Sequence, residues 1–147
     1  MRRGTVRAGV VALAALLFTV GAGPAHTQEL PRELSRVAAA WHRGDASTIA
    51  GLGAKGGISL DVDGSSVGPL GPRQAAAVLR RVFEERESVG VRTAQTRTVG
   101  GDPPRAFGEL SWNVRTRGTT IPEQSKVFVA FVREGDRWRV TEIRLLR

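Results

Sequence analysis

The stretch Gly71–Arg86, GPRQAAAVLRRVFEER, constrains how the rest of this 147-residue chain can pack. Pro72 suits the first turn of a helix, where a residue without an N–H loses no hydrogen bond. After it, apolar side chains recur at spacings of three and four and therefore share one helix face: Ala75, Val78, Leu79, Val82 and Phe83. A single helix cannot bury such a stripe alone, and the chain that follows is strand-like almost throughout. The pattern therefore predicts a long helix lying across a sheet.

Two helices are predicted before this stretch, and the second of them is short. The first covers Gln28–His42 and carries apolar residues at helical spacing: Leu30, Leu34, Val37, Ala38 and Trp41. Gly44 follows its last turn, as helix-ending glycines do. Asp45 then begins a second helix, where its carboxylate can accept a hydrogen bond from a free N–H at or near Thr48. The glycine-rich segment Gly51–Gly57 ends that helix.

Strands are predicted on both sides of the long helix. Ile58–Val62 alternates apolar and polar side chains, as half-buried strands do, and a turn at Asp63–Ser66 leads into a short returning strand at Val67–Leu70. After the helix, breaks rich in glycine and proline separate four extended segments, which predict a meander: Val91–Val99, Ala106–Arg117, Lys126–Arg133 and Trp138–Leu146. Strands with helices segregated to one face make a single α+β domain over residues 28–147.

Two of these strands carry further information. Lys126–Arg133, KVFVAFVR, is apolar on both faces, which indicates a central strand covered on both sides or a contact between copies. In the last strand, the parity of the apolar side chains changes between Val140 and Ile143. A β-bulge near Thr141–Glu142 would bring both halves of that strand's apolar set to the same face.

The composition excludes several functional classes. The chain has no cysteine, which removes disulfides, thiol catalysis and thiolate metal sites. Its net charge of +8 favours anionic partners in general. The arginines are spread along the chain without a cluster or stacked aromatic residues, so no nucleic-acid partner is expected.

The first 25 residues have the three parts of a secretory signal peptide. A basic start, Met1–Arg7, precedes the uninterrupted apolar run Ala8–Val20 and the small-residue segment Gly21–Ala25. We expect cleavage after Ala25, with cleavage after Thr27 or retention as an anchor as alternatives, although the apolar run is short for a membrane span. The mature protein is then expected to be exported, periplasmic or extracellular, without a stable membrane span.

The region from Val37 to Leu146 resembles the nuclear transport factor 2-like superfamily, whose fold is also called cystatin-like. The resemblance is carried by AAAWHRGDASTIAGL, by the hairpin before GPRQAAAVLRRVFEE, and by the ending GDRWRVTEIRLL. More narrowly, the chain is similar to a bacterial family of small exported domains of unknown function. The glycine-rich segment Gly51–Gly57 departs from the denser helix end usual there.

The resemblance implies a cone-shaped α+β fold. N-terminal helices and one long helix would pack on a curved, mostly antiparallel sheet and leave a conical pocket open at one end. Members use this pocket in isomerases, in dehydratases and for ligand binding, or use the sheet for dimerisation, and the fold alone does not choose among these uses.

Five large side chains are candidates for lining a ligand pocket: Trp41, Phe83, Trp112, Phe128 and Phe131. The alternative is that they fill the core completely. Trp112 is the first to test, because it lies in mid-strand among the small residues Ala106 and Gly108.

No catalytic set is evident. An isomerase-like site needs a carboxylate base with phenol or protonated-acid donors, and the chain has no tyrosine. Asp61 and Asp63 flank a turn, and Glu109 faces the polar side of its strand. The two histidines, His26 and His42, lie at the predicted cleavage site and at a helix end. We therefore predict no catalytic residue, metal or cofactor.

We expect a non-enzymatic binding or scaffold domain of unknown ligand, whose partner is a small apolar molecule. One alternative is a small-molecule enzyme, isomerase- or dehydratase-like, that uses Asp61 or Glu109 as its pocket carboxylate. The other is a homodimeric structural module that associates through the open face of the sheet.

Overall fold

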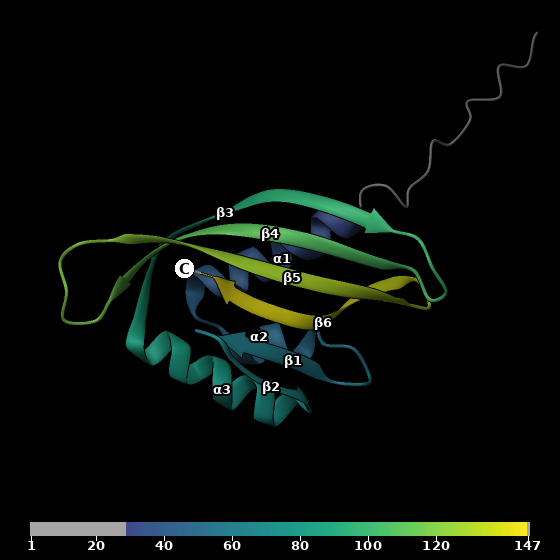
Figure 1. Cartoon of the computed structure of the whole chain (residues 1–147), viewed down its shortest axis with the longest axis horizontal. Helices are drawn as coiled ribbons and strands as arrows, with labels where there is room; N and C mark the ends of the chain where they lie inside the picture. Colours follow the sequence, from purple (N-terminus) through teal and green to yellow (C-terminus); the bar gives the residue numbers. More distant parts are fainter. Residues whose placement is uncertain (1–28, 147) are drawn as a thin grey trace, which may run out of the picture.

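The structure, a computed structural model, describes residues 29–146 (Figure 1). Within this range the chain forms three helices and six strands, in this order: α1 (Glu29–Arg43), α2 (Ala46–Gly51), β1 (Ile58–Val62), β2 (Ser65–Leu70), α3 (Pro72–Glu85), β3 (Arg86–Val99), β4 (Arg105–Thr116), β5 (Glu123–Glu134) and β6 (Arg137–Leu146). The predicted sequence of helix pair, hairpin, long helix and meander is confirmed. The predicted signal peptide, residues 1–25, lies outside the described residues.

The described strands join one curved sheet in the order β2-β1-β6-β5-β4-β3. Neighbouring strands are antiparallel except β1 and β6, which run parallel. Figure 1 shows the long strands β4 and β5 passing in front of α1, with α3 beside β1 and β2. A mostly antiparallel sheet with its helices on one side confirms the predicted α+β class.

The two faces of the sheet differ in cover. In β4 the buried residues alternate with more exposed ones, as predicted, and share one face: Ala106, Gly108, Leu110, Trp112 and Val114. At Gly108 an added Cβ would lie 2.6 Å from Cδ1 of Leu34, so α1 lies directly against this face. We call it the helix face and the opposite side the open face.

The helices bury the predicted stripes. In α1 all five predicted apolar residues are buried, and in α3 Val78 is partly buried and the rest of the stripe is buried. Helix α3 packs on α2 and also contacts β1, β2 and β3, strands that lie at both edges of the sheet. It therefore bridges the edges of the bent sheet, whereas α1 lies within the bend against β3, β4 and β6. The covering role predicted for the long helix is thus shared with α1. No helix among the described residues is long and apolar enough to cross a membrane.

The helix boundaries follow the predicted caps. Gly44 has φ +65° directly after α1, a conformation that favours glycine. Asp45 caps α2, because its Oδ1 accepts from the Thr48 N–H at 3.0 Å and its Oδ2 from Thr48 Oγ1 at 2.6 Å. The second helix then ends at Gly51.

Three strands begin two or more residues earlier than the sequence predicted: β2, β3 and β5, the last of which starts at Glu123 instead of Lys126. A two-residue turn at Asp63 and Gly64, with φ 53° and 82°, returns the chain at once, so β2 already starts at Ser65. Strand β3 starts at Arg86, immediately after α3. The Arg86 N–H still bonds to the Val82 carbonyl while its backbone is extended, so one residue both ends the helix and opens the strand.

The predicted β-bulge in β6 is confirmed. Ala130 pairs with Glu142 and Phe131 pairs with Val140, which leaves Thr141 as an extra residue in β6. The apolar residues on both sides of the bulge are consequently all buried: Trp138, Val140, Ile143 and Leu145.

Candidate functional site

Three of the five predicted pocket residues meet on the helix face. Trp41 of α1 lies 5.1 Å from Phe83 of α3 and 5.4 Å from Trp112 of β4, measured between ring centroids, and all contacts are edge-to-face. Phe83 and Trp112 are 6.5 Å apart. The side chains are only 1%, 9% and 0% exposed for Trp41, Phe83 and Trp112. The space between α1, α3 and β4 is therefore filled by the rings of this aromatic cluster.

A short polar chain leaves the cluster. The Trp112 indole N–H donates to Ser88 Oγ at 3.0 Å, and the same hydroxyl lies 3.3 Å from His42 Nδ1. His42 is in the last turn of α1, as predicted, and is exposed. The buried Trp41 indole N–H has no hydrogen-bond partner among the described residues.

The side chains of the other two predicted pocket residues point to opposite faces of the sheet, although both residues line the larger hollow of the open face. Phe131 is 2% exposed and lies on the helix face, where it pairs with Ala106. Phe128 has the opposite parity, and its ring stacks on Phe107 at 5.2 Å on the open face. The five residues thus do not line one cavity. Trp41, Phe83 and Trp112 meet, Phe131 lies further along the helix face, and the Phe128 side chain lies on the open face.

Phe107 is the site residue that the sequence reasoning missed. It falls between Ala106 and Gly108 and therefore points away from the buried set of β4. An aromatic residue at a polar-face position of an alternating strand was the available signal. Phe107 and Phe128 together form an apolar ridge across β4 and β5.

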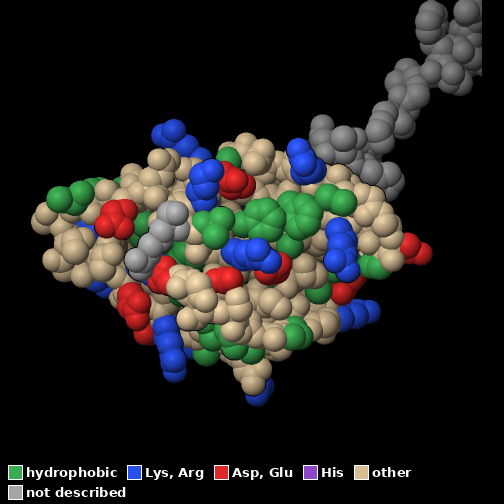
Figure 2. Space-filling model, in the orientation of Figure 1, with side chains coloured by type: hydrophobic (Ala, Val, Ile, Leu, Met, Phe, Trp, Pro, Cys, Tyr) green, Lys and Arg blue, Asp and Glu red, His purple; other side chains and the backbone are tan. Residues whose placement is uncertain are grey.

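Two hollows flank this ridge on the open face. The larger, of about 640 Å³, extends over β5 and β6, and the smaller, of about 410 Å³, lies toward β3. Both are lined by Phe107 and Phe128. Figure 2 shows apolar side chains gathered at the centre of this face, between basic and acidic ones. The open face therefore has an apolar centre and a charged rim.

The rim carries both signs of charge. Lys126 Nζ lies 3.1 Å from Glu109 Oε1, and Arg144 Nε donates to Glu142 Oε1 at 2.5 Å. The Glu142 carboxylate raises the pKa of Arg144 above its ordinary value. Arg105 adds a further exposed cation to the wall of the larger hollow.

The two carboxylates considered as catalytic bases both belong to the open face. Glu109 is paired with Lys126, and Asp61, which points to the same side, accepts a hydrogen bond from Ser66 Oγ at 2.8 Å. Neither reaches the aromatic cluster behind the sheet. Among residues 29–146, no group of three histidine or acidic side chains is placed to hold a metal ion.

The sequence and the structure were compared with those of known proteins. No family model matches the sequence. No curated protein matches it either. Solved structures do match in shape. A DUF4783 family protein from Bacteroides ovatus has a TM-score of 0.62 and 17% identity, with 80% of this chain and 94% of that chain covered.

Two further structures carry descriptions of the fold. A domain of unknown function with a cystatin-like fold from Nostoc punctiforme has a TM-score of 0.64 and 15% identity over 85% of this chain and 78% of that one. A hypothetical protein with a ketosteroid isomerase-like fold from Catenulispora acidiphila, in complex with trimethylamine, has a TM-score of 0.62 and 18% identity over 80% of this chain and 85% of that one. The fold predicted from the resemblance is therefore confirmed: the chain has the cystatin-like, nuclear transport factor 2-like architecture.

Proposed function

We propose that this protein is a non-enzymatic binding domain whose recognition surface is the open face of the sheet. The observation that carries the proposal is the contrast between the two sides: rings fill the helix face, while two half-buried phenylalanines and two hollows occupy the open face. A volume of about 640 Å³ falls within the ordinary range of small-molecule sites. The ligand class that fits is a small apolar molecule seated against Phe107 and Phe128.

Catalysis is the weaker alternative for this chain. An isomerase- or dehydratase-like mechanism needs an acid–base group inside a water-poor cavity. Asp61 and Glu109 lie on the open face, each bound to a polar partner. The trimethylamine of the Catenulispora protein belongs to that protein.

A second copy of the chain is the other occupant that a specific observation favours. The ridge of Phe107 and Phe128 stands between two hollows, so a two-fold arrangement can seat the ridge of each copy in a hollow of the other. The open face of β3–β6 covers about 750 Å² at ordinary strand spacing and rise. Each partner of a standard stable interface buries about 800 Å².

Export belongs to the same proposal. The basic start, the apolar run and the small-residue segment of residues 1–25 support it. N-terminal sequencing of the protein recovered from its host's export compartment tests it directly. A mature N-terminus at His26 or Gln28 is expected, and an intact Met1 would contradict cleavage.

Native mass spectrometry of the same material tests the binding proposal. A monomer with a retained small apolar mass supports the ligand, and a doubled mass supports the dimer. Phe128→Glu should abolish either state, whereas Val67→Glu, at an exposed apolar position on β2, should leave it intact. A bare monomer in every sample, at concentrations high enough for dimerisation, would contradict both candidates.

A further inference from the structure

A third hollow lies at one end of the helix face, where the ends of two helices and two strands come together. The last turn of α1, the last turns of α3, the start of β3 and the chain after β4 enclose a space of about 340 Å³. The basic residues that line it are Arg43, Arg80, Arg86, Arg117 and His42. We call it the arginine hollow.

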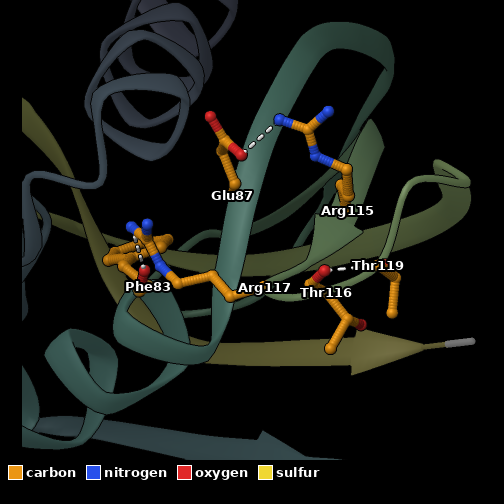
Figure 3. Close-up of polar contacts among 6 residues, drawn as sticks. All are labelled: Phe83, Glu87, Arg115, Thr116, Arg117 and Thr119. Carbon is orange, nitrogen blue, oxygen red and sulfur yellow. Dashed lines mark hydrogen bonds and ion pairs between the residues drawn. The ribbon is translucent and has the colours of Figure 1, made fainter.

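Most acidic groups near these arginines already have partners. Glu87 Oε2 accepts from Arg115 Nη2 at 2.5 Å, and this guanidinium holds the pKa of Glu87 below its usual value (Figure 3). Asp63 is paired with Arg86. Only Glu84 is left in the lining as a carboxylate without such a partner among the described residues.

Asp45, the acid closest to Arg43, is also occupied. Both of its oxygens accept from Thr48, and these hydrogen bonds are the main reason why the pKa of Asp45 is lowered. Arg43 Nη2 remains 3.9 Å from Asp45 Oδ2, beyond hydrogen-bond distance. The guanidinium donors of Arg43 are therefore unused by this acid.

Two more guanidinium groups keep free donors. Arg80 is exposed and has no hydrogen bond or ion pair among the described residues. Arg117 reaches back from the end of β4, and its Nη2 donates to the Phe83 carbonyl at 3.4 Å, as Figure 3 shows. Its remaining N–H groups have no acceptor within residues 29–146, so Arg43, Arg80 and Arg117 each offer donors to the hollow.

Four of the helix-end carbonyls at this end are already hydrogen-bonded to backbone N–H groups. Helix ends carry a partial negative charge on unpaired carbonyls, which would oppose an anion. Here the carbonyls of Ala40 and Trp41 accept from the two residues after α1. Those of Val82 and Glu85 accept from backbone N–H groups of Arg86 and Arg117.

In one of its two neutral tautomers, His42 can add a further donor. Ser88 Oγ accepts the Trp112 indole proton, so its own proton is available for His42 Nδ1. With Nδ1 as acceptor, the imidazole carries its proton on Nε2. The ring is thereby anchored to the aromatic cluster through Ser88 while it lines the hollow.

We propose that the arginine hollow is a binding site for a small multivalent oxyanion, a phosphate or polycarboxylate group held by Arg80, Arg117 and Arg43 with His42 beside them. Several planar guanidinium donors at separate positions match an anion with several oxygens better than a single carboxylate. This site is separate from the open face, and its existence does not depend on what binds there.

The tryptophans provide the readout for the test. Phe83 lines the hollow and contacts both Trp41 and Trp112, and Ser88 links Trp112 to His42. The purified protein is titrated with inorganic phosphate and with citrate at constant ionic strength, with chloride as the reference. We expect a saturable change in tryptophan fluorescence, matched by heat in calorimetry, for phosphate, citrate or both. The stronger of the two identifies the oxyanion class.

Matched variants locate the binding. Arg80→Gln and Arg117→Gln should each weaken it about tenfold, the value of one charge-assisted hydrogen bond. Arg73→Gln, an equal charge change on the exposed start of α3, should leave it unchanged. Arg80 is exposed and makes no hydrogen bond or ion pair within residues 29–146, so this variant remains informative if Arg117→Gln is unstable. Absence of saturable binding, or equal loss in all three variants, overturns the proposal.

Discussion

The two faces of β4 and β5 belong to the same strands, but helices cover one face and leave the other uncovered. On the covered face Trp112 and Phe131 are buried. On the other face the half-buried rings of Phe107 and Phe128 stack on each other. Alternation alone places aromatic residues on both sides. What separates core from surface is the cover that α1 and α3 supply, so the half-buried pair on the open face can be reached by a partner and the covered cluster cannot.

Phe83→Ala removes a ring from the covered face and should lower the free energy of unfolding more than any other proposed variant. Removing this ring opens a cavity beside Trp41 and Trp112, and the loss should be about 3–5 kcal/mol of unfolding free energy. Arg80→Ala, on the solvent side of the same helix, should cost less than about 0.5 kcal/mol. Urea denaturation followed by circular dichroism compares them. An unchanged midpoint for Phe83→Ala would show that α3 does not seal the cluster.

Gly108→Ala tests how closely α1 lies on the helix face. The new methyl would meet Leu34, itself buried, so overpacking should cost about 1–3 kcal/mol. Gly90→Ala is the control, because nothing lies within 4 Å of an added Cβ there. Equal midpoints for the two variants would mean that α1 sits further from β4.

Phe128→Ala probes the uncovered side and should cost little. Its ring loses mainly the stacking on Phe107, worth about 0.5–1.5 kcal/mol. Phe131→Ala, three residues away on the covered face, should resemble Phe83→Ala instead. Thermal unfolding of the pair, together with the native mass of Phe128→Ala, measures both. If Phe128→Ala were as destabilising as Phe131→Ala, the open face would be part of the core.

The smallest effect is expected at the cap of α2, which belongs to neither face. The Thr48 hydrogen bonds lower the pKa of Asp45, so its charge stabilises the fold above the unfolded pKa of about 3.9. This contribution is lost as the pH falls through the lowered folded pKa. Asp45→Asn keeps a capping side chain but not the charge. Its small stability deficit should be full at neutral pH and vanish in acid, and a deficit that grows in acid would contradict the assignment.

Much of this fold could be predicted from local patterns. The stripe of α3, the Asp45 cap and the bulge at Thr141 each follow from spacing or parity within one element. The pairing of β1 with β6 could not be, because it joins segments far apart in sequence and leaves no local mark. The same reason hides the arginine hollow, whose cations come from four separate elements.

The candidate site was harder to predict than the fold. The five large aromatic residues are recognisable in the sequence as one candidate set, but whether aromatic rings line a cavity or fill it depends on the distance between helices and sheet. Within that set Phe128 has the parity of the open face, where it stacks on Phe107. The size of each side chain is known from the sequence. Which face of the sheet the helices cover depends on tertiary packing and could not be predicted from it.

Nuclear magnetic resonance with a small apolar probe such as toluene tests the central claim most directly. The account predicts saturable shifts at the amides of Phe107 and Phe128 and unchanged indole N–H signals of Trp41 and Trp112. Shifts of those two indole signals, with none at Phe107 and Phe128, would contradict it.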